Sequence, residues 1–216
     1  MTELSWASLD TPVGVVSVGC TGAGVARVRY GRPAVPTQAG RSAAPLSSAS
    51  RGQWEGVPAG QHSGAAARLS ETARTELIEY FRGDRRAFDV PIDWAPTAGP
   101  QRQVLTVLAQ TVGYGETISY GALARRAGLS ADPTPARVVG TIMAANPVAI
   151  IVPCHRVLAS DGLGGYSGGS GVEVKRWLLI LEGSHPPTLD WDALGLPAIG
   201  GSGGRPPAHS RHRSTA

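Results

Sequence analysis

The sequence predicts an α/β protein of the α+β type, with a small strand-rich N-terminal domain that carries one helix and a mainly helical C-terminal domain. Two observations lead to this fold class. Runs rich in β-branched residues occupy the first 30 positions, whereas apolar residues recur at helical spacing from Leu69 onward. A Pro-rich joint at 95–100 separates the two patterns. We therefore expect domains at 1–96 and 97–183, followed by a disordered tail at 184–216.

Three strands are expected near the start of the chain. Residues 4–8 alternate between apolar and polar side chains, and residues 13–18 and 25–30 are rich in valine. Gly22 and Gly24 supply the turn between the last two runs. These runs make up the strand-rich part of the N-terminal domain.

An insertion, a helix and an extended segment complete this domain. Residues 31–65 are mainly Ala, Ser, Pro, Gly and Gln with little to bury, which predicts a flexible surface insertion. The apolar face of the following helix consists of Leu69, Ala73, Leu77, Tyr80 and Phe81. Gly83 ends that helix, and residues 88–92 alternate as a short strand or extended segment.

The C-terminal half is predicted to form helices around one short apolar strand. One face of its first helix consists of Val104, Leu105, Val107, Leu108 and Val112. Ser119 is the expected N-cap of a helix over 120–127. Thr134 and Pro135 have the pattern of a cap and a first helical residue, and they open a helix that continues through Ala145. Two helices joined by a short turn with Gly and Pro are typical of a helix-turn-helix.

The remaining elements surround a cysteine. Residues 148–152 are all apolar and predict a buried strand that leads almost directly into Cys154. A glycine-rich loop at 162–171 then leads into a last helix. The inward residues of that helix are expected to be Val174, Trp177, Leu178 and Leu181.

Composition excludes some classes of protein. The chain has no run of 18 apolar residues, and its first residues lack the basic-then-apolar pattern of a secretory signal. We therefore expect no membrane partner and a cytoplasmic location. The net charge of +4 is weak support for a nucleic-acid partner, because most of the excess lies in 31–65 and 184–216.

The two cysteines are too few for a disulfide framework. Cys20 and Cys154 also lack a CxxC or HxxxH companion, so we expect two reduced thiols, no bound metal and no cofactor.

The string Pro153-Cys154-His155 carries the candidate chemistry. A thiol must become a thiolate to attack carbon, and an adjacent imidazole can accept its proton directly or through one water. Glu182, at the end of the last helix, is the candidate carboxylate that orients the imidazole. The alternative is that Cys154 is inert packing, since neighbouring residues often point apart. Spacing alone leaves both interpretations open.

The wider pattern resembles the methylated-DNA–protein-cysteine methyltransferase family. The resemblance covers residues 97–182, and a looser likeness of style extends over the N-terminal half. The motifs that carry it are Gly113-Tyr114-Gly115-Glu116-Thr117-Ile118-Ser119-Tyr120, Ala136-Arg137-Val138-Val139-Gly140, Asn146-Pro147, Pro153-Cys154-His155-Arg156-Val157, Tyr166-Ser167-Gly168-Gly169 and Lys175-Arg176-Trp177-Leu178-Leu179-Ile180-Leu181-Glu182. The string around Cys154 is the most specific of these.

The resemblance implies a DNA-repair reaction and assigns roles to residues. Cys154 is the acceptor of an alkyl group from O6-alkylguanine in double-stranded DNA, with O4-alkylthymine left open as a second substrate. His155 is then the base, Glu182 orients it, and Asn146 links the recognition helix to the active-site strand through hydrogen bonds to the backbone. The transfer is irreversible and occurs once per molecule, and the protein acts as a monomer.

The resemblance also implies base flipping. The target guanine leaves the duplex before reaction. Arg137 matches the residue that fills the vacated space, and Tyr120 matches the residue that rotates the 3′ phosphate. Residues that match the base pocket are Met143, Val157, Tyr166 and Ser167. The family places the recognition helix in the minor groove, unlike most helix-turn-helix proteins.

The chain departs from the family pattern in places. Pro100 and Leu105 replace an expected Phe and Trp, which affects packing. The stretch 129–134 is longer than usual between the two helices. Cys20 has no His nearby and does not reproduce the N-terminal zinc set of some members.

Three other functions compete with alkyl transfer. A protein that binds alkylated guanine without accepting the group usually lacks the cysteine, which is present here. A cysteine hydrolase leaves Arg137 and Tyr120 unexplained. A helix-turn-helix regulator with an incidental cysteine is expected to prefer a particular DNA sequence.

Overall fold

The computed structural model describes residues 4–33 and 64–186. The expected insertion at 31–65 and the expected tail at 184–216 therefore lie mostly outside the described residues. Within the described ranges, no helix is both long and apolar enough to cross a membrane. The cytoplasmic location stays a prediction.

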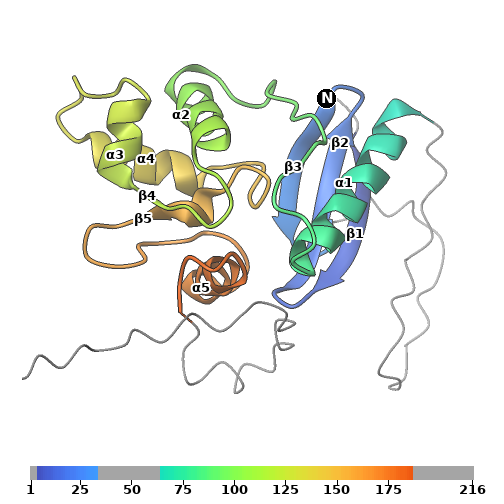
Figure 1. Ribbon diagram of the computed structural model, residues 1–216. Coiled ribbons are helices and arrows are strands. Elements are labelled where there is room, and N and C mark those ends of the chain that lie inside the picture. Colours follow the sequence, from blue (N-terminus) through green and yellow to red (C-terminus); the bar gives the residue numbers. More distant parts are fainter. Residues whose placement is uncertain (1–3, 34–63, 187–216) are drawn as a thin grey trace, which may run out of the picture.

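The N-terminal part is a three-stranded antiparallel sheet with one helix packed on it. Strands β1 (Ser5–Thr11), β2 (Gly14–Thr21) and β3 (Gly24–Tyr30) pair in that order, which confirms the three expected strands. Leu9 pairs with Val16, and Val18 pairs with Val28, so alternate apolar side chains gather on one face. Helix α1 (Ala65–Phe81) covers that face (Figure 1).

Helix α1 begins at Ala65, which is the last residue of the expected insertion and lies four residues before Leu69. The helix buries the face that the periodicity indicates, with Ala73, Leu77 and Tyr80 fully enclosed. Gly83 follows with φ of 81°, a conformation that glycine adopts without steric cost and that ends the helix.

The described C-terminal part contains four α-helices, one 3₁₀ helix and a two-stranded parallel pair. Its elements are α2 (Gly99–Thr111), β4 (Ile118–Ser119), α3 (Tyr120–Arg126), α4 (Pro135–Ala144), the 3₁₀ helix η1 (Cys154–Arg156), β5 (Val157–Leu158) and α5 (Val172–Leu181). Helices α3 and α4 pack on each other as the helix-turn-helix pattern predicts. Figure 1 shows α2, α3 and α4 grouped beside the β3 side of the sheet, with α5 apart from them.

Both predicted caps, Ser119 and Thr134, lie at the N-cap positions of their helices, but only Ser119 makes the capping hydrogen bond. The Ser119 hydroxyl accepts a hydrogen bond from the Ala122 amide at 3.1 Å, as an N-cap should. Thr134 precedes α4 but makes no such bond with its side chain. The carboxylate of Asp132 instead accepts the Thr134 amide at 2.7 Å, because an Asp two residues earlier forms an Asx turn there.

The predicted strand at 148–152 is wrong. This run is buried as expected, but it forms a tight turn in which the Val152 amide bonds to the Val148 carbonyl at 2.9 Å. Ile150 has a φ of 75°, which is unusual for a β-branched residue and incompatible with a regular strand. The strand comes after Cys154 instead, as β5, and pairs with β4.

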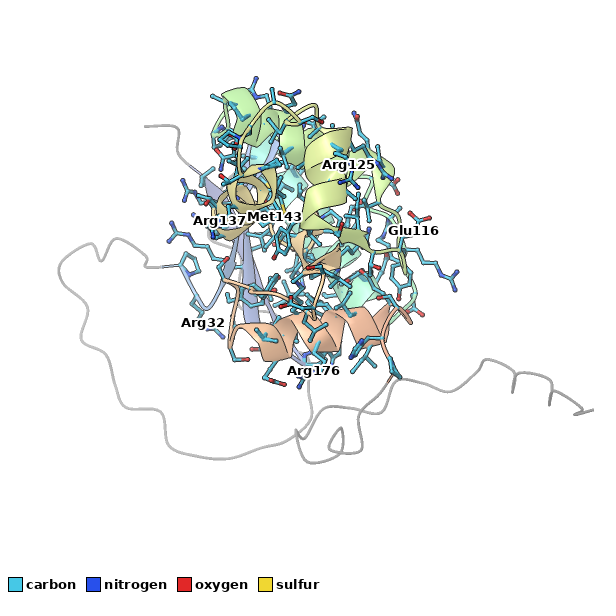
Figure 2. The ribbon with its side chains drawn as sticks, turned by 90° about the vertical axis from the view of Figure 1, so that its left-hand side faces the viewer. Arg32, Glu116, Arg125, Arg137, Met143 and Arg176 are labelled. Carbon is cyan, nitrogen blue, oxygen red and sulfur yellow. The ribbon has the colours of Figure 1, made fainter. Side chains whose placement is uncertain are left out.

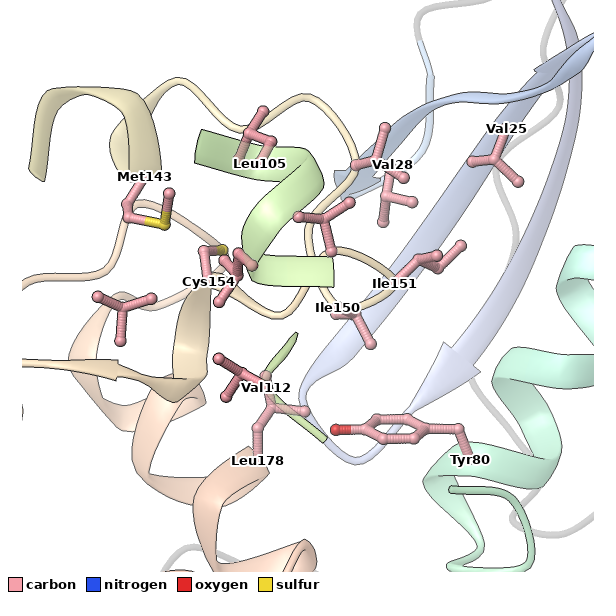
Figure 3. Packing of buried hydrophobic residues seen from close by; sticks show 14 of the residues in the cluster. Val25, Val28, Tyr80, Leu105, Val112, Met143, Ile150, Ile151, Cys154 and Leu178 are labelled. Carbon is pink, nitrogen blue, oxygen red and sulfur yellow. The ribbon is translucent and has the colours of Figure 1, made fainter. Parts of the chain in front are cut away.

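The two parts pack against each other. Their buried hydrophobic residues form one continuous cluster (Figure 3). The Val28 amide at the edge of β3 donates to the Pro147 carbonyl at 2.8 Å. This contact joins the sheet to the turn that precedes Cys154. The proposed division after residue 96 stays a prediction.

Candidate active site

Cys154 is the first residue of η1 and lines a pocket of about 340 Å³. The other lining residues are Tyr120, Gly140, Met143, Ala144, Gly165, Tyr166 and Ser167. They come from α3, α4 and the glycine-rich loop, so the helix-turn-helix forms part of the pocket wall. Figure 3 shows the side chain of Met143 extending from its helix toward the region of Cys154. Cys154 is only 5% exposed.

Three of the four predicted pocket residues line this pocket. Met143, Tyr166 and Ser167 do, and the Ser167 hydroxyl donates to the Ala144 carbonyl at 3.0 Å. Val157 does not line it, and its side chain is fully buried in β5. Tyr166 is held from the N-terminal part, since its hydroxyl bonds to the Tyr30 hydroxyl at 2.8 Å.

The other predicted DNA contacts lie at the edge of the pocket. Tyr120 begins α3, and its ring is half-buried. Arg137 is exposed on α4, one turn before the pocket residue Gly140 (Figure 2). This placement leaves the guanidinium of Arg137 free to contact a partner outside the protein. Its part in flipping stays a prediction.

The environment of Cys154 favours the neutral thiol at rest. Burial raises the pKa of Cys154, and the hydrogen bond from Asn146, the charge of Lys175 and the hydrogen bond from Tyr166 act in the opposite direction. A thiol with a raised pKa needs a base to become reactive. The surroundings of Cys154 therefore include groups that stabilise its ionised form, and one of them, Tyr166, lines the pocket.

His155 and Glu182 form a fully buried pair behind the cysteine. Oε1 of Glu182 lies 2.8 Å from Nε2 of His155. Burial lowers the pKa of His155, although Glu182 opposes this, so the ring is neutral at neutral pH. Because the carboxylate can only accept, Nε2 carries the proton and Nδ1 keeps its lone pair. Among the described residues, buried Nδ1 has no hydrogen-bond partner.

Sequence reasoning missed two further side chains that bind Glu182. Arg156 donates to it through Nε at 2.9 Å and Nη2 at 3.0 Å, and Tyr80 donates to Oε1 at 2.7 Å. Burial alone would raise the pKa of Glu182, but the hydrogen bonds and charges of His155 and Arg156 outweigh it and lower the pKa to about 2. Arg156 lies inside the recognisable motif, whereas Tyr80 gave no signal beyond its place on the buried face of α1.

Sequence reasoning also missed the role of Lys175 in the fold. It is fully buried, and Nζ donates to the Val157 carbonyl at 2.7 Å and to the Gly165 carbonyl at 3.3 Å. Its ammonium lies 5.8 Å from the ring centre of Tyr120, and burial lowers the pKa of Lys175 to about 8. One feature of the sequence distinguishes this residue in advance, because Lys175 is the only lysine in the chain.

Asn146 closes the turn that leads to Cys154. Its Nδ2 donates to the Val152 carbonyl at 2.9 Å, and its Oδ1 accepts from the Val148 amide at 3.0 Å. One side chain thus satisfies backbone groups at both ends of the buried run. This explains how an irregular backbone is tolerated there and why the predicted strand does not form.

The described residues contain no group of three or more His, Cys, Asp or Glu side chains arranged to hold a metal ion. Cys20 is buried in β2, and burial raises its pKa to about 12, so this second thiol is unreactive at neutral pH.

Comparison with known proteins identifies similar sequences. A family model described as the DNA-binding domain of 6-O-methylguanine DNA methyltransferase matches residues 99–184. The human methylated-DNA–protein-cysteine methyltransferase is 49% identical over 104 residues, which are 48% of this chain and 44% of the human protein. The protein of the same name from Mycobacterium tuberculosis is 43% identical over 139 residues, which are 64% of this chain and 74% of the relative. This chain thus spans less than half of the human relative and about three quarters of the mycobacterial one.

Solved structures agree with these relatives. The crystal structure of Mycobacterium tuberculosis OGT in complex with DNA matches with a TM-score of 0.59 and 33% identity, over 83% of this chain and 93% of that chain. The Mycobacterium tuberculosis O6-methylguanine methyltransferase matches with a TM-score of 0.61 and 32% identity, over 86% and 96% of the two chains. The predicted α+β fold class is confirmed by these matches together with the described sheet and helices.

Proposed function

This chain belongs to the methylated-DNA–protein-cysteine methyltransferase family, and we propose that it repairs DNA by moving an alkyl group from O6 of guanine onto Cys154. The observation that carries the proposal is the position of Cys154. It lines a pocket of about 340 Å³, within the range of small-molecule sites, and it is backed by the buried pair of His155 and Glu182.

The reaction is a displacement at carbon. Sγ of Cys154 forms a bond to the alkyl carbon while the bond from that carbon to O6 breaks. The electron pair of the broken bond goes to the guanine, which takes up a proton and is restored. The product is a thioether, which water does not hydrolyse at neutral pH, so each molecule reacts once.

The thiol proton needs an acceptor inside the protein. His155 is neutral at neutral pH, and its Nδ1 keeps a lone pair because Nε2 is bonded to Glu182. We assign Nδ1 as the acceptor of the thiol proton, directly or through one water. Glu182, held as an anion by Arg156, stabilises the imidazolium that results.

Double-stranded DNA with an alkylated guanine is the proposed partner, and the protein is proposed to act as a monomer. The guanine must leave the stack to reach Cys154, which is almost fully buried. In this proposal Arg137 enters the space that the base leaves, and Tyr120 at the pocket edge contacts the neighbouring phosphate. Unstacking costs a few kcal/mol, which such contacts offset.

Intact mass after mixing with duplex DNA that contains O6-methylguanine tests the proposal. We expect a gain of one methylene per molecule that never exceeds one equivalent. Cys154→Ala should show no gain and keep its affinity for DNA, whereas Cys20→Ala should react like the wild type because Cys20 lies in β2, away from the pocket.

Other outcomes favour other functions. Lesion binding with no mass gain in the wild type favours recognition without transfer. A mass gain that water later reverses favours a hydrolase, and binding that depends on DNA sequence alone favours a regulator.

A further inference from the structure

Tyr80 brings a hydroxyl from the N-terminal part to the buried carboxylate of Glu182. It lies in the last turn of α1, is fully buried, and donates to Oε1 of Glu182 over 2.7 Å, across 102 positions of the chain. Burial raises the pKa of Tyr80 well above its usual value, and the neighbouring Glu182 carboxylate raises it further. The phenol therefore keeps its proton and always acts as a donor.

The oxygen that Tyr80 binds is the one that holds His155. Oε1 of Glu182 accepts from Tyr80 at 2.7 Å, from Nε2 of His155 at 2.8 Å and from Nη2 of Arg156 at 3.0 Å. Oε2 is occupied by Nε of Arg156 and by the Gly115 amide. Three donors on one oxygen fix the rotation of the carboxylate and share its negative charge among them.

The ring of Tyr80 is clamped, so the direction of its hydroxyl is set by packing. The ring centres of Phe81, Phe88 and Tyr114 lie 5.5, 5.4 and 6.2 Å away. Figure 3 shows Tyr80 extending from α1, with its hydroxyl directed toward Leu178 of α5. Two of the three clamping residues belong to the N-terminal part, which therefore aims the hydroxyl.

We propose that Tyr80 is a positioning residue for alkyl transfer, through which the N-terminal part sets the orientation and the basicity of His155. The proposal rests on the proposed function, in which His155 takes the thiol proton. Tyr80 touches neither DNA nor Cys154 in this role. It acts through Glu182, whose fixed Oε1 holds the imidazole so that Nδ1 remains the acceptor.

The direction of the effect follows from the shared oxygen. Each donor on Oε1 weakens the hydrogen bonds that the same oxygen accepts from the other donors. Loss of the phenol proton donor strengthens the bond from Glu182 to the His155 ring and raises the affinity of that ring for a proton. The acid limb of the transfer rate, where His155 becomes protonated, must then move to higher pH.

Tyr80→Phe tests the proposal and Tyr114→Phe is its matched control. Tyr114 also donates a hydroxyl near the end of α5, but to the Leu181 carbonyl at 2.9 Å and not to the carboxylate. Both variants keep the ring and lose one hydroxyl. Two readouts are compared, the pH profile of single-turnover transfer at saturating DNA and the titration of His155 by nitrogen NMR without DNA, assigned with His155→Gln.

We expect the titration midpoint of His155 and the acid limb of the transfer rate to move up by about half a pH unit in Tyr80→Phe and not in Tyr114→Phe. A shift of this size corresponds to a fraction of the free energy of one hydrogen bond. The transfer rate of Tyr80→Phe at saturating DNA should fall about tenfold, which is a smaller decrease than removal of the His155 base would cause. The affinity for DNA should not change. Identical titrations in the wild type and both variants, or equal shifts in both variants, overturn the proposal and leave Tyr80 a packing residue. Failure of the wild type to gain a methyl group would refute the proposed function instead, while the DNA-free titration still tests the link from Tyr80 to His155.

Discussion

The side-chain amide of Asn146 donates to the backbone carbonyl of Val152 over 2.9 Å and so closes the turn that delivers Cys154 to the pocket. The same side chain accepts the Val148 amide at 3.0 Å. The backbone inside this turn includes Ile150 at a φ of 75°, a conformation that costs on the order of 1 kcal/mol and persists only when its surroundings enforce it. Asn146 is the residue that enforces it.

Asn146→Ala should therefore loosen the turn and slow transfer to Cys154. Two hydrogen bonds disappear: the buried Val148 amide loses its partner, and the Val152 carbonyl keeps only its bond from the Cys154 amide. We therefore expect a loss of about 2 to 3 kcal/mol in the free energy of unfolding, measured with urea. Gln101→Ala is the control, because Gln101 also donates an amide proton to a backbone carbonyl, that of Ala145, but at the surface. A loss in Asn146→Ala no larger than in the control would contradict this role.

The turn also shows where sequence reasoning stops. Five apolar residues at 148–152 predict burial, and all but Ala149 are buried. The same run says little about backbone conformation, which depends on the amide of Asn146. By contrast, β1 and α1 followed from the spacing of their apolar residues, and β2 and β3 followed from their β-branched content.

The candidate site divides in the same way. The motif around Cys154 led to the hypothesis that Glu182 orients the imidazole of His155, and the two side chains lie in contact. Tyr80 could not be found from the sequence, because the contact joins residues 102 positions apart and nothing in the local pattern of α1 distinguishes it from a core tyrosine. Arg137 and Tyr120 keep roles that the fold permits and that only DNA can test.

Glu182 should make stability fall in acid. Burial alone would raise its pKa, but His155 and Arg156 lower it from an ordinary 4.5 to about 2, so the folded state binds fewer protons than the unfolded chain between these values. The stabilisation is complete above about pH 4.5 and is lost as pH falls toward 2. Over that window we expect the contribution of Glu182 to the free energy of unfolding to decrease by about 3 kcal/mol.

Glu182→Gln isolates this contribution. The variant leaves Arg156 buried without its partner charge, so it should be less stable than the wild type by about 3 to 5 kcal/mol at pH 7, and the gap should narrow toward pH 2. Glu173→Gln is the surface control, since Glu173 pairs with Arg176 in solvent. A gap that stays constant from pH 7 to pH 2 would refute the assigned pKa.

Lys175 should also make the free energy of unfolding rise with pH, but in a window at high pH. Burial lowers its pKa from 10.5 to about 8, so between these values the unfolded chain binds more protons than the folded one. The free energy of unfolding of the wild type minus that of Lys175→Met should rise by about 3 kcal/mol from pH 8 to 10.5. The subtraction removes the contributions of the buried tyrosines, which both proteins share.

The single lysine permits a direct measurement. Lysine labelled with ¹³C at Cε gives one signal from the chain, since Lys175 is the only lysine. Its titration midpoint should lie near pH 8 in the folded protein and near the ordinary value in urea. A midpoint near 10.5 in the folded state would contradict both the assigned pKa and the expected rise in stability.

Arg137 should matter for duplex DNA and little for a free base. It is exposed on α4 one turn before the pocket residue Gly140. Its proposed role is to fill the space that the flipped base leaves between stacked bases, and that space exists only in duplex DNA. We expect Arg137→Ala to slow single-turnover transfer from duplex O6-methylguanine by about a hundredfold, the scale of a few kcal/mol of unstacking, while transfer from the free base changes less than about twofold. Arg176→Ala removes the same charge from α5, where the side chain pairs with Glu173, and should affect both substrates weakly. Equal losses on duplex and free base in Arg137→Ala would mean that Arg137 supports the pocket itself, because a residue that acts only on the stack has nothing to contribute once the base is already free.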